Sequence, residues 1–123
     1  MTNEQQLIYL AGFVDGEGCL THSRDKKHGR HRPQLRISGT FKPIMQWIKM
    51  LFGGNYYVIK PRKGQNKASY DWVLSTNQAI ELVKCLMPYL KVKKEEAKVF
   101  VSFYKSDIKT SIKLANQLST LKR

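Results

Sequence analysis

Cysteine is scarce in this sequence, and the two cysteines, Cys19 and Cys85, lie far apart without a C-x-x-C spacing. This pattern excludes a zinc ribbon and a disulfide framework, and it suits a reducing compartment. The sequence also has no run of about 18 apolar residues, the length that a membrane-spanning helix requires. Because the N-terminus lacks the basic region and long apolar stretch of a signal peptide, we expect a protein that is not secreted.

Acidic residues are few as well: 9 Asp plus Glu stand against 22 Lys plus Arg, and the net charge is +13. Basic residues usually form a solvated surface, but so large an excess in 123 residues is more typical of a protein that binds a polyanion. This length suffices for one hydrophobic core. We therefore expect residues 1–106 to form a single domain and residues 107–123 to form a C-terminal helical extension of it.

The stretch from Tyr9 to Gly18 is expected to be the end of a short helix that starts with a capping box at Thr2 or Asn3. Apolar residues cover nearly every side of this helix, which is typical of a buried helix. Gly12 and Gly16 fall on one face, where the lack of side chains allows two backbones to approach closely. In so small a protein, the helix can be buried against a second copy of itself.

Two acids, Asp15 and Glu17, appear where this helix ends among glycines. Carboxylates beside a close helix contact are costly unless they have partners, and a divalent metal is one such partner. The plainer interpretation is a buried helix with a glycine-rich C-cap, in which Asp15 is a local cap.

Two β-hairpins follow, with expected strands at residues 19–24 and 32–40 and at residues 56–62 and 69–75. The strands alternate in polarity, so that one face of the sheet is apolar and the other is polar. Further helices are expected after Pro43, after Thr76, near Lys93 and after Asp107. The order α-ββ-α-ββ-α-α(α) predicts an α+β fold, with helices on one face of a four-stranded antiparallel sheet.

The polar face and its two basic hairpin tips form the larger functional signal. From Arg24 to Arg36 six Lys or Arg face one acid, and from Lys60 to Lys67 there are four bases and no acid. A single charged tip usually means solvation, but two tips of one sign on one sheet fit a saddle that follows a DNA duplex. Arg36 or Arg32 can read guanine and Gln34 adenine. The expected DNA-binding residues are Thr21, Ser23, Arg24, Arg30, Arg32, Gln34, Arg36, Ser38, Tyr56, Lys60, Arg62 and Asp71.

Residues Leu10 to Gly18 read L-A-G-F-V-D-G-E-G, which closely resembles the signature L-A-G-L-I-D-A-D-G of the LAGLIDADG homing endonucleases. The main departure is Glu17, where the signature has Asp, and both are hard oxygen ligands suited to Mg²⁺. The order of strands and helices resembles the same family from about Gln5 to Tyr104. This resemblance implies the LAGLIDADG fold, α-ββ-α-ββ-α, with a saddle-shaped sheet.

The resemblance also implies roles for individual residues. Glu17 matches the acid that binds the catalytic divalent metal, expected to be Mg²⁺, for which Mn²⁺ can substitute. Asp15 matches the earlier acid, to which we assign a structural role first and a metal role second. Lys93, in a basic turn before the fourth helix, matches a lysine near the cleavage site. A polar residue that positions water in some relatives falls near Phe41, which cannot do so; the alternatives are Thr40, Lys42 or a water held by the substrate alone.

The function that the resemblance implies is site-specific cleavage of double-stranded DNA by phosphodiester hydrolysis. One motif per chain supplies one acid site, so that cutting two strands at a long pseudo-palindromic site implies a homodimer. The protein is then expected in the cytoplasm or nucleoid of a prokaryote or phage-infected cell, or in an organelle matrix. The expected dimer-interface residues are Leu7, Leu10, Ala11, Gly12, Val14 and Gly16.

Three other functions fit parts of the sequence. An RNA-splicing maturase of the same fold would bind intron RNA, and a DNA-binding module of this fold would have lost catalysis. The acid at position 17 and Lys93 favour an enzyme over both. A small basic ribosome-associated protein would explain the charge but not the acidic, glycine-rich motif.

Overall fold

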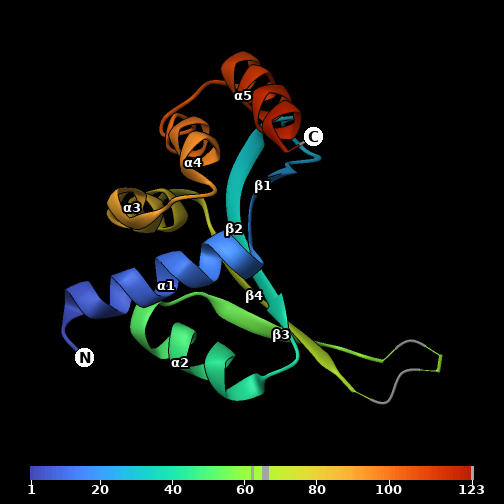
Figure 1. Cartoon of the computed structure of the whole chain (residues 1–123). Helices are drawn as coiled ribbons and strands as arrows, with labels where there is room; N and C mark the ends of the chain where they lie inside the picture. Colours follow the sequence, from blue (N-terminus) through green and yellow to red (C-terminus); the bar gives the residue numbers. More distant parts are fainter. Residues whose placement is uncertain (62, 65–66, 123) are drawn as a thin grey trace.

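The computed structural model describes residues 1–61, 63–64 and 67–122. A four-stranded antiparallel sheet, in the order β1-β2-β4-β3, is covered on one face by helices (Figure 1). The expected α+β fold is therefore confirmed. The strands are β1 (Gly18–Arg24), β2 (His31–Gly39), β3 (Asn55–Ile59) and β4 (Ser69–Ser75). The helices are α1 (Asn3–Glu17), α2 (Lys42–Phe52), α3 (Thr76–Leu86), the 3-10 helix η1 (Met87–Tyr89), α4 (Lys94–Val101) and α5 (Ile108–Leu121).

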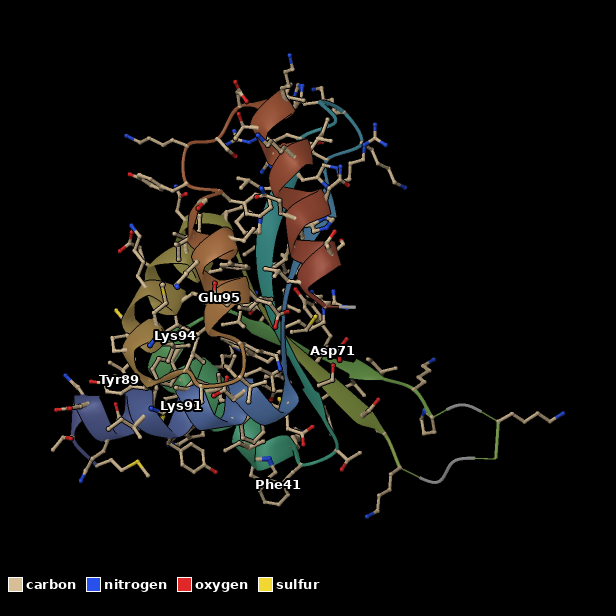
Figure 2. All side chains as sticks on the ribbon, turned by 45° about the horizontal axis from the view of Figure 1, so that its top comes forward. Phe41, Asp71, Tyr89, Lys91, Lys94 and Glu95 are labelled. Atoms are coloured by element: carbon tan, nitrogen blue, oxygen red, sulfur yellow. The ribbon has the colours of Figure 1, made fainter. Side chains whose placement is uncertain are left out.

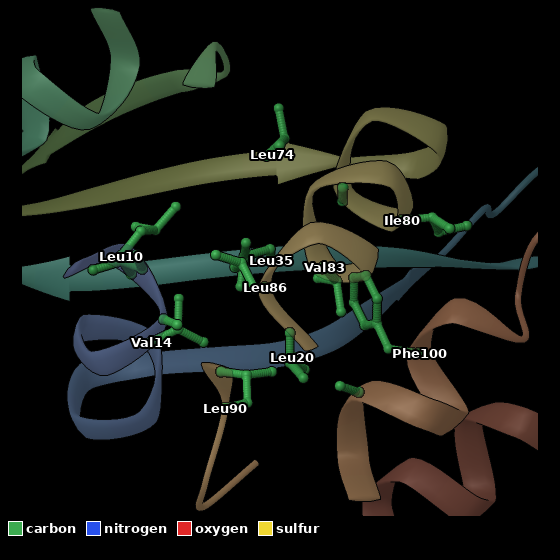
Figure 3. Close-up of a cluster of buried hydrophobic side chains, with 14 of the residues drawn as sticks. Leu10, Val14, Leu20, Leu35, Leu74, Ile80, Val83, Leu86, Leu90 and Phe100 are labelled. Atoms are coloured by element: carbon green, nitrogen blue, oxygen red, sulfur yellow. The ribbon is translucent and has the colours of Figure 1, made fainter. Parts of the chain in front are cut away.

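The hydrophobic core lies between the sheet and the helices (Figure 3). In β2 the side chains of Pro33, Leu35 and Ile37 are buried, whereas the residues between them are not. This period of two is the signature of a strand with one face in the core. Leu20 of β1 and Phe100 of α4 are also fully buried, so the two ends of the chain share one core.

Helix α1 begins with the capping box of Thr2 and Gln5, which confirms one of the two expected start signals. The Thr2 side chain accepts from the Gln5 backbone N–H at 3.1 Å, and the Gln5 side chain accepts from the Thr2 backbone N–H at 2.9 Å. Each bond satisfies a donor that the helix itself leaves free. The start of the helix is therefore fixed by local sequence.

The two glycines after α2, Gly53 and Gly54, both have positive φ angles, of 83° and 77°. The Gly53 carbonyl accepts a hydrogen bond from the Trp72 indole N–H at 2.9 Å. A Cβ on Gly54 would lie 2.6 Å from the Val73 carbonyl oxygen, but within the described residues a Cβ on Gly53 would meet nothing within 4 Å. The turn thus needs a left-handed backbone at both positions and close packing at one.

Alanine at each of these glycines should therefore destabilise the protein by different amounts. Gly53→Ala should lower the free energy of unfolding by about 1 kcal/mol, the strain of a left-handed backbone. Gly54→Ala should lower it by about 3 kcal/mol, because the clash with β4 adds to the same strain. Chemical denaturation of both variants measures the difference, and equal losses would contradict the predicted clash.

Helix α5 packs over the core side of the β1–β2 hairpin. Its N-cap, Asp107, accepts from the Thr110 backbone N–H at 2.7 Å, as a capping residue should. Ser111 is fully buried, and its hydroxyl accepts from the His31 backbone N–H of β2 at 3.1 Å. Leu118 is fully buried as well. The expected C-terminal helix therefore exists and packs on the same core.

Beneath α5, the imidazoles of His22 and His31 meet with their Nδ1 atoms 2.9 Å apart. Both side chains are partly buried, and one nitrogen must donate while the other accepts. Burial, followed by the positive charges of His31 and Lys122, lowers the pKa of His22 below its ordinary value of 6.5. The folded protein therefore favours a neutral His22.

This lowered pKa predicts a loss of stability in mild acid. Below pH 6.5 the unfolded chain protonates His22 more readily than the folded chain does, so unfolding takes up a proton and stability falls as the pH falls. We expect the melting temperature to drop between about pH 7 and pH 5.5, and to drop less in the His22→Gln variant. Parallel pH curves for the two proteins would contradict this assignment.

Candidate functional site

Helix α1 passes directly into strand β1, and Glu17 lies at this junction. The Gly18 backbone N–H bonds to the Val14 carbonyl and ends the helix. A Cβ on Gly18 would lie 2.8 Å from the Val14 Cα, so only glycine allows the chain to turn this tightly here. Glu17 is the last helical residue, and it is exposed. The junction thus presents a carboxylate at the start of the sheet.

Asp15 is held by the turn before α4. Its two carboxylate oxygens accept from the backbone N–H groups of Lys91 and Lys93, at 2.7 and 3.0 Å. Burial raises the pKa of Asp15, but these backbone hydrogen bonds and the charge of Lys93 outweigh burial and lower it overall. The structural role that we placed first for Asp15 therefore fits the geometry. Each oxygen already has one backbone partner, and a metal role for Asp15 stays a prediction.

Lys93 lies against the last turn of α1. Its Nζ donates to the Asp15 backbone carbonyl at 2.9 Å, where a helix has carbonyls without helical partners. A cation at a helix C-terminus is also favoured by the helix dipole. The fold therefore places the Lys93 ammonium on the carbonyl of Asp15, two residues before Glu17 in α1. Figure 2 shows the neighbouring Lys91 beside this helix.

A cavity of about 360 Å³ lies beside Glu17, between α1, the end of β2 and the start of α2. Thr40 lines it and so lies near Glu17, and the neighbouring Phe41 also lines it but is 64% exposed. The cavity combines one carboxylate with apolar and hydroxyl-bearing walls. Its lining residues are Tyr9, Phe13, Glu17, Ser38, Gly39, Thr40, Phe41, Ile44 and Met45.

The donor set at Glu17 is small. Within the described part of the chain, no three His, Cys, Asp or Glu side chains are grouped closely enough to hold a metal ion. Glu17 is an exposed hard-oxygen donor, which fits Mg²⁺, an ion that keeps several waters and takes only one or two carboxylates. One chain therefore presents one exposed carboxylate of the kind that such an ion takes.

The sheet face opposite the helices, called the open face here, carries the polar side chains of β1, β2 and β4. Thr21 pairs with Gln34 and Ser23 pairs with Arg32, so all four point to this face. Arg36 and Ser38 follow by alternation along β2. Asp71 pairs with Ser38 from β4 and lies on the side away from the helices (Figure 2). The predicted side-chain orientation of these residues is confirmed.

For four other expected DNA-binding residues, the structure does not show the side chain on the open face. Tyr56 pairs with Trp72 and packs on the core, so its assignment to the open face is wrong. Arg24 pairs with His31 and shares its side of the sheet, so it too points away from the open face. Lys60 lies beyond the end of β3. Arg62 lies outside the described residues.

Strand β3 instead presents Asn55, Tyr57 and Ile59 to the open face, which our sequence reading missed. Tyr57 pairs with Asp71, and its side chain is more than half exposed. The only signal in the sequence was the neighbouring pair of tyrosines, either of which could point inward.

The remaining expected residue, Arg30, lies in the β1–β2 tip. The hydrogen bonds from Thr110 lower the pKa of the Asp107 carboxyl most, and Arg30 is close enough for its charge to lower this pKa further.

The expected dimer interface on α1 divides into two sides. Leu10, Ala11 and Val14 are 0% exposed and belong to this chain's own core, so their assignment to the interface is wrong. Gly12 and Gly16 lie on the opposite side and are exposed. Leu7 is only partly buried. A hollow of about 580 Å³ along this exposed side is lined by Ile8, Tyr9, Gly12, Phe13, Gly16 and Glu17.

Comparison with solved structures gives the same fold over nearly the whole chain. The archaeal intron-encoded homing endonuclease I-Vdi141I matches with a TM-score of 0.76 and 21% identity, over 99% of this chain and 87% of that one. The homing endonuclease I-CvuI matches with a TM-score of 0.74 and 20% identity, over 96% of this chain and 82% of that one. The LAGLIDADG meganuclease I-AabMI matches with a TM-score of 0.61 and 24% identity, over 94% of this chain but only 43% of its own length.

Comparison with a sequence-family profile points the same way, although no curated protein sequence matches this chain. Across the described ranges, no helix is both long and apolar enough to cross a membrane. The family profile described as LAGLIDADG endonuclease matches residues 10–106, which include the α1 motif, the whole sheet and helices α2 to α4. This chain therefore belongs to the LAGLIDADG endonuclease family.

Proposed function

We propose that this chain is a site-specific DNA endonuclease that works as a homodimer on a long pseudo-palindromic site. The observation that carries the proposal is the position of Glu17, an exposed acid at the point where the family's motif helix meets the polar open face. A duplex on that face would pass directly over this carboxylate. The net charge of +13 supplies the attraction for the DNA backbone.

The relatives of known structure support this proposal. I-CvuI was solved in complex with its target in the presence of Ca, and in complex with the I-CreI target, not cleaved, in the presence of Mg. I-Vdi141I was solved in complex with DNA. These proteins share the fold of this chain, and the family profile includes Glu17 and Lys93 within its matched residues.

In the proposed complex the open face reads the duplex. Arg32, Gln34 and Arg36 alternate along one strand, and a two-stranded ribbon fits the major groove. The β1–β2 tip carries Lys26 and Lys27, which are exposed and suited to phosphate contacts. Phosphate contacts would set the position of the protein, and base contacts would set the sequence that it recognises.

At the centre of the site, Glu17 would hold a divalent cation. The chemistry that such a cation would supply is a more acidic water and stabilisation of the charge on the phosphate oxygens. Lys93, fixed at the end of α1, would place a positive charge near the same phosphate. Thr40 lines the cavity beside Glu17 and can donate a hydrogen bond to a water. Mg²⁺ is the expected cation, and Mn²⁺ is expected to substitute.

The homodimer is inferred from the number of acidic sites that one chain provides. One chain presents one Glu17, and cleavage of two strands needs two such sites. A two-fold axis along the exposed side of α1 would bring two copies of Glu17 together. Gly12 and Gly16 carry no side chains, so two helices could approach closely where these positions meet.

The proposal is tested by exposing randomised duplex DNA to the purified protein with Mg²⁺ and sequencing the cut ends. We expect a few related sequences with two-fold symmetry to be cut on both strands, and no cutting in EDTA. Cutting in Mn²⁺ in place of Mg²⁺ tests the expected substitution. If DNA is bound but no sequence is cut under any of these conditions, the chain is a binding protein and the proposal fails.

A further inference from the structure

On the open face, five polar side chains form one connected chain of contacts, called the Arg36 network here. The Arg36 guanidinium donates from Nη2 to the Gln34 side-chain oxygen at 3.1 Å, and its Nη1 lies 3.5 Å from the Asp71 carboxylate. The Gln34 amide nitrogen donates to the Ser75 hydroxyl at 3.4 Å, and the Ser38 hydroxyl donates to Asp71. The network thus joins β2 to β4 through three contacts.

Strand register explains how these side chains meet. Gln34 pairs directly with Ser75, and Ser38 pairs directly with Asp71. Arg36 pairs with Val73, which offers no polar atom, so the long arginine side chain reaches diagonally to Asp71. Gln34 and Asp71 then hold the guanidinium from two sides.

Asp71 is out of place on a surface that binds a polyanion. It is the only acid among the paired strand residues of the open face, in a chain of net charge +13. A carboxylate could accept a hydrogen bond from a cytosine amino group. However, one Asp71 oxygen accepts from Ser38, the other faces Arg36, and the side chain is only 16% exposed. Both of its oxygens already have partners within the protein, and little of the carboxylate is exposed to a base.

Arg36, in contrast, keeps donors for a ligand. Each terminal nitrogen of a guanidinium carries two N–H groups. One on Nη1 is directed to Asp71 and one on Nη2 to Gln34, which leaves one on each nitrogen. The Arg36 side chain is 43% exposed. Two parallel N–H groups match the O6 and N7 acceptors of guanine in the major groove.

We propose that Asp71 is a positioning residue that fixes the Arg36 guanidinium for bidentate reading of one guanine in each half-site. This inference rests on the proposed function. Asp71 does not touch the base but limits the rotation of Arg36, so that less conformational entropy is lost on binding. Gln34 completes the fixation and is therefore committed to Arg36 instead of reading adenine by itself.

The test compares the base preference of the unmodified protein with that of Asp71→Asn, Arg36→Ala and the double variant, by selection from randomised duplexes. Asp71→Asn should lower the preference for guanine at one position of each half-site by about fivefold or more, and leave the other positions unchanged. Arg36→Ala should affect the same position, and the double variant should lose no more than Arg36→Ala alone. Glu81→Gln, which removes a paired carboxylate from α3, is the control for charge alone.

Several results would overturn the inference. If Asp71→Asn strengthens binding to all sequences equally, Asp71 acts only through its charge. If it changes a different position from Arg36→Ala, Asp71 reads a base itself. If the unmodified protein selects no sequence at all, the proposed function fails together with this inference. If it selects a sequence but Asp71→Asn does not change the preference for guanine, only this inference fails.

A second measurement needs no DNA. Nitrogen NMR of the Arg36 guanidinium should show separate, slowly exchanging Nη signals in the unmodified protein, and averaged signals in Asp71→Asn. Averaged signals in the unmodified protein would mean that Asp71 does not restrain Arg36.

Discussion

Glu17→Gln should reduce DNA cleavage by at least about 1,000-fold and leave DNA binding nearly unchanged. Glutamine keeps the size of the side chain but removes the charge that holds a divalent cation. The cation is worth several kcal/mol in stabilising charge on the phosphate, and each 1.4 kcal/mol is about tenfold in rate. Glu17 is exposed, so the substitution should not alter the melting temperature.

The measurement pairs single-turnover cleavage of a selected target with a binding titration of the same DNA. Glu81→Gln on α3 is a matched control, because it removes an exposed carboxylate far from the open face. It should cut at the normal rate. Cleavage by Glu17→Gln within tenfold of the unmodified protein would falsify the assignment of Glu17 as the metal-binding acid.

Gly12→Leu should abolish the homodimer and, with it, double-strand cleavage. Within the described residues, a Cβ on Gly12 meets nothing within 4 Å, so a leucine fits the isolated chain. It should even stabilise α1 by up to about 1 kcal/mol, since glycine is a poor helix former. A leucine cannot fit between two backbones in close contact, so the loss should be confined to the dimer.

Light scattering and a supercoiled-plasmid assay measure the two effects together. Gln78→Leu, which adds the same side chain to an exposed position of α3, should stay dimeric and should linearise the plasmid. Gly12→Leu should be monomeric, with a melting temperature at least as high as before. A monomeric unmodified protein, both free and on DNA, would rule out the dimer altogether.

The features that the sequence revealed are those determined by local patterns. The period of two in β2 separates Leu35 and Ile37 from Gln34 and Arg36 without any tertiary information, and the burial of the side chains in this strand follows the same period. The capping box at Thr2 is likewise local. The acid at position 17 was found through the motif, whose glycines fix where the helix must end.

The features that were missed depend on partners far away in the chain. Tyr56 and Tyr57 are equally suited to either face, and only pairing with β4 turns Tyr57 outward. On α1, apolar residues on every side do not show which side meets the core, and α3 and η1 are among the elements that pack against this helix. The partners of Asp15 lie more than seventy positions away, so no local pattern connects them to it.

The alternation of β2 has a consequence for engineering. Its open-face positions can be randomised without touching Leu35 or Ile37, so recognition can be recoded at little cost in folding stability. The connected contacts of Gln34, Arg36 and Asp71 set the limit. Because Arg36 contacts both Gln34 and Asp71, the effect of changing one of these residues depends on the other two, so single substitutions should show strong epistasis. A library for a new target should therefore vary these three positions as one block.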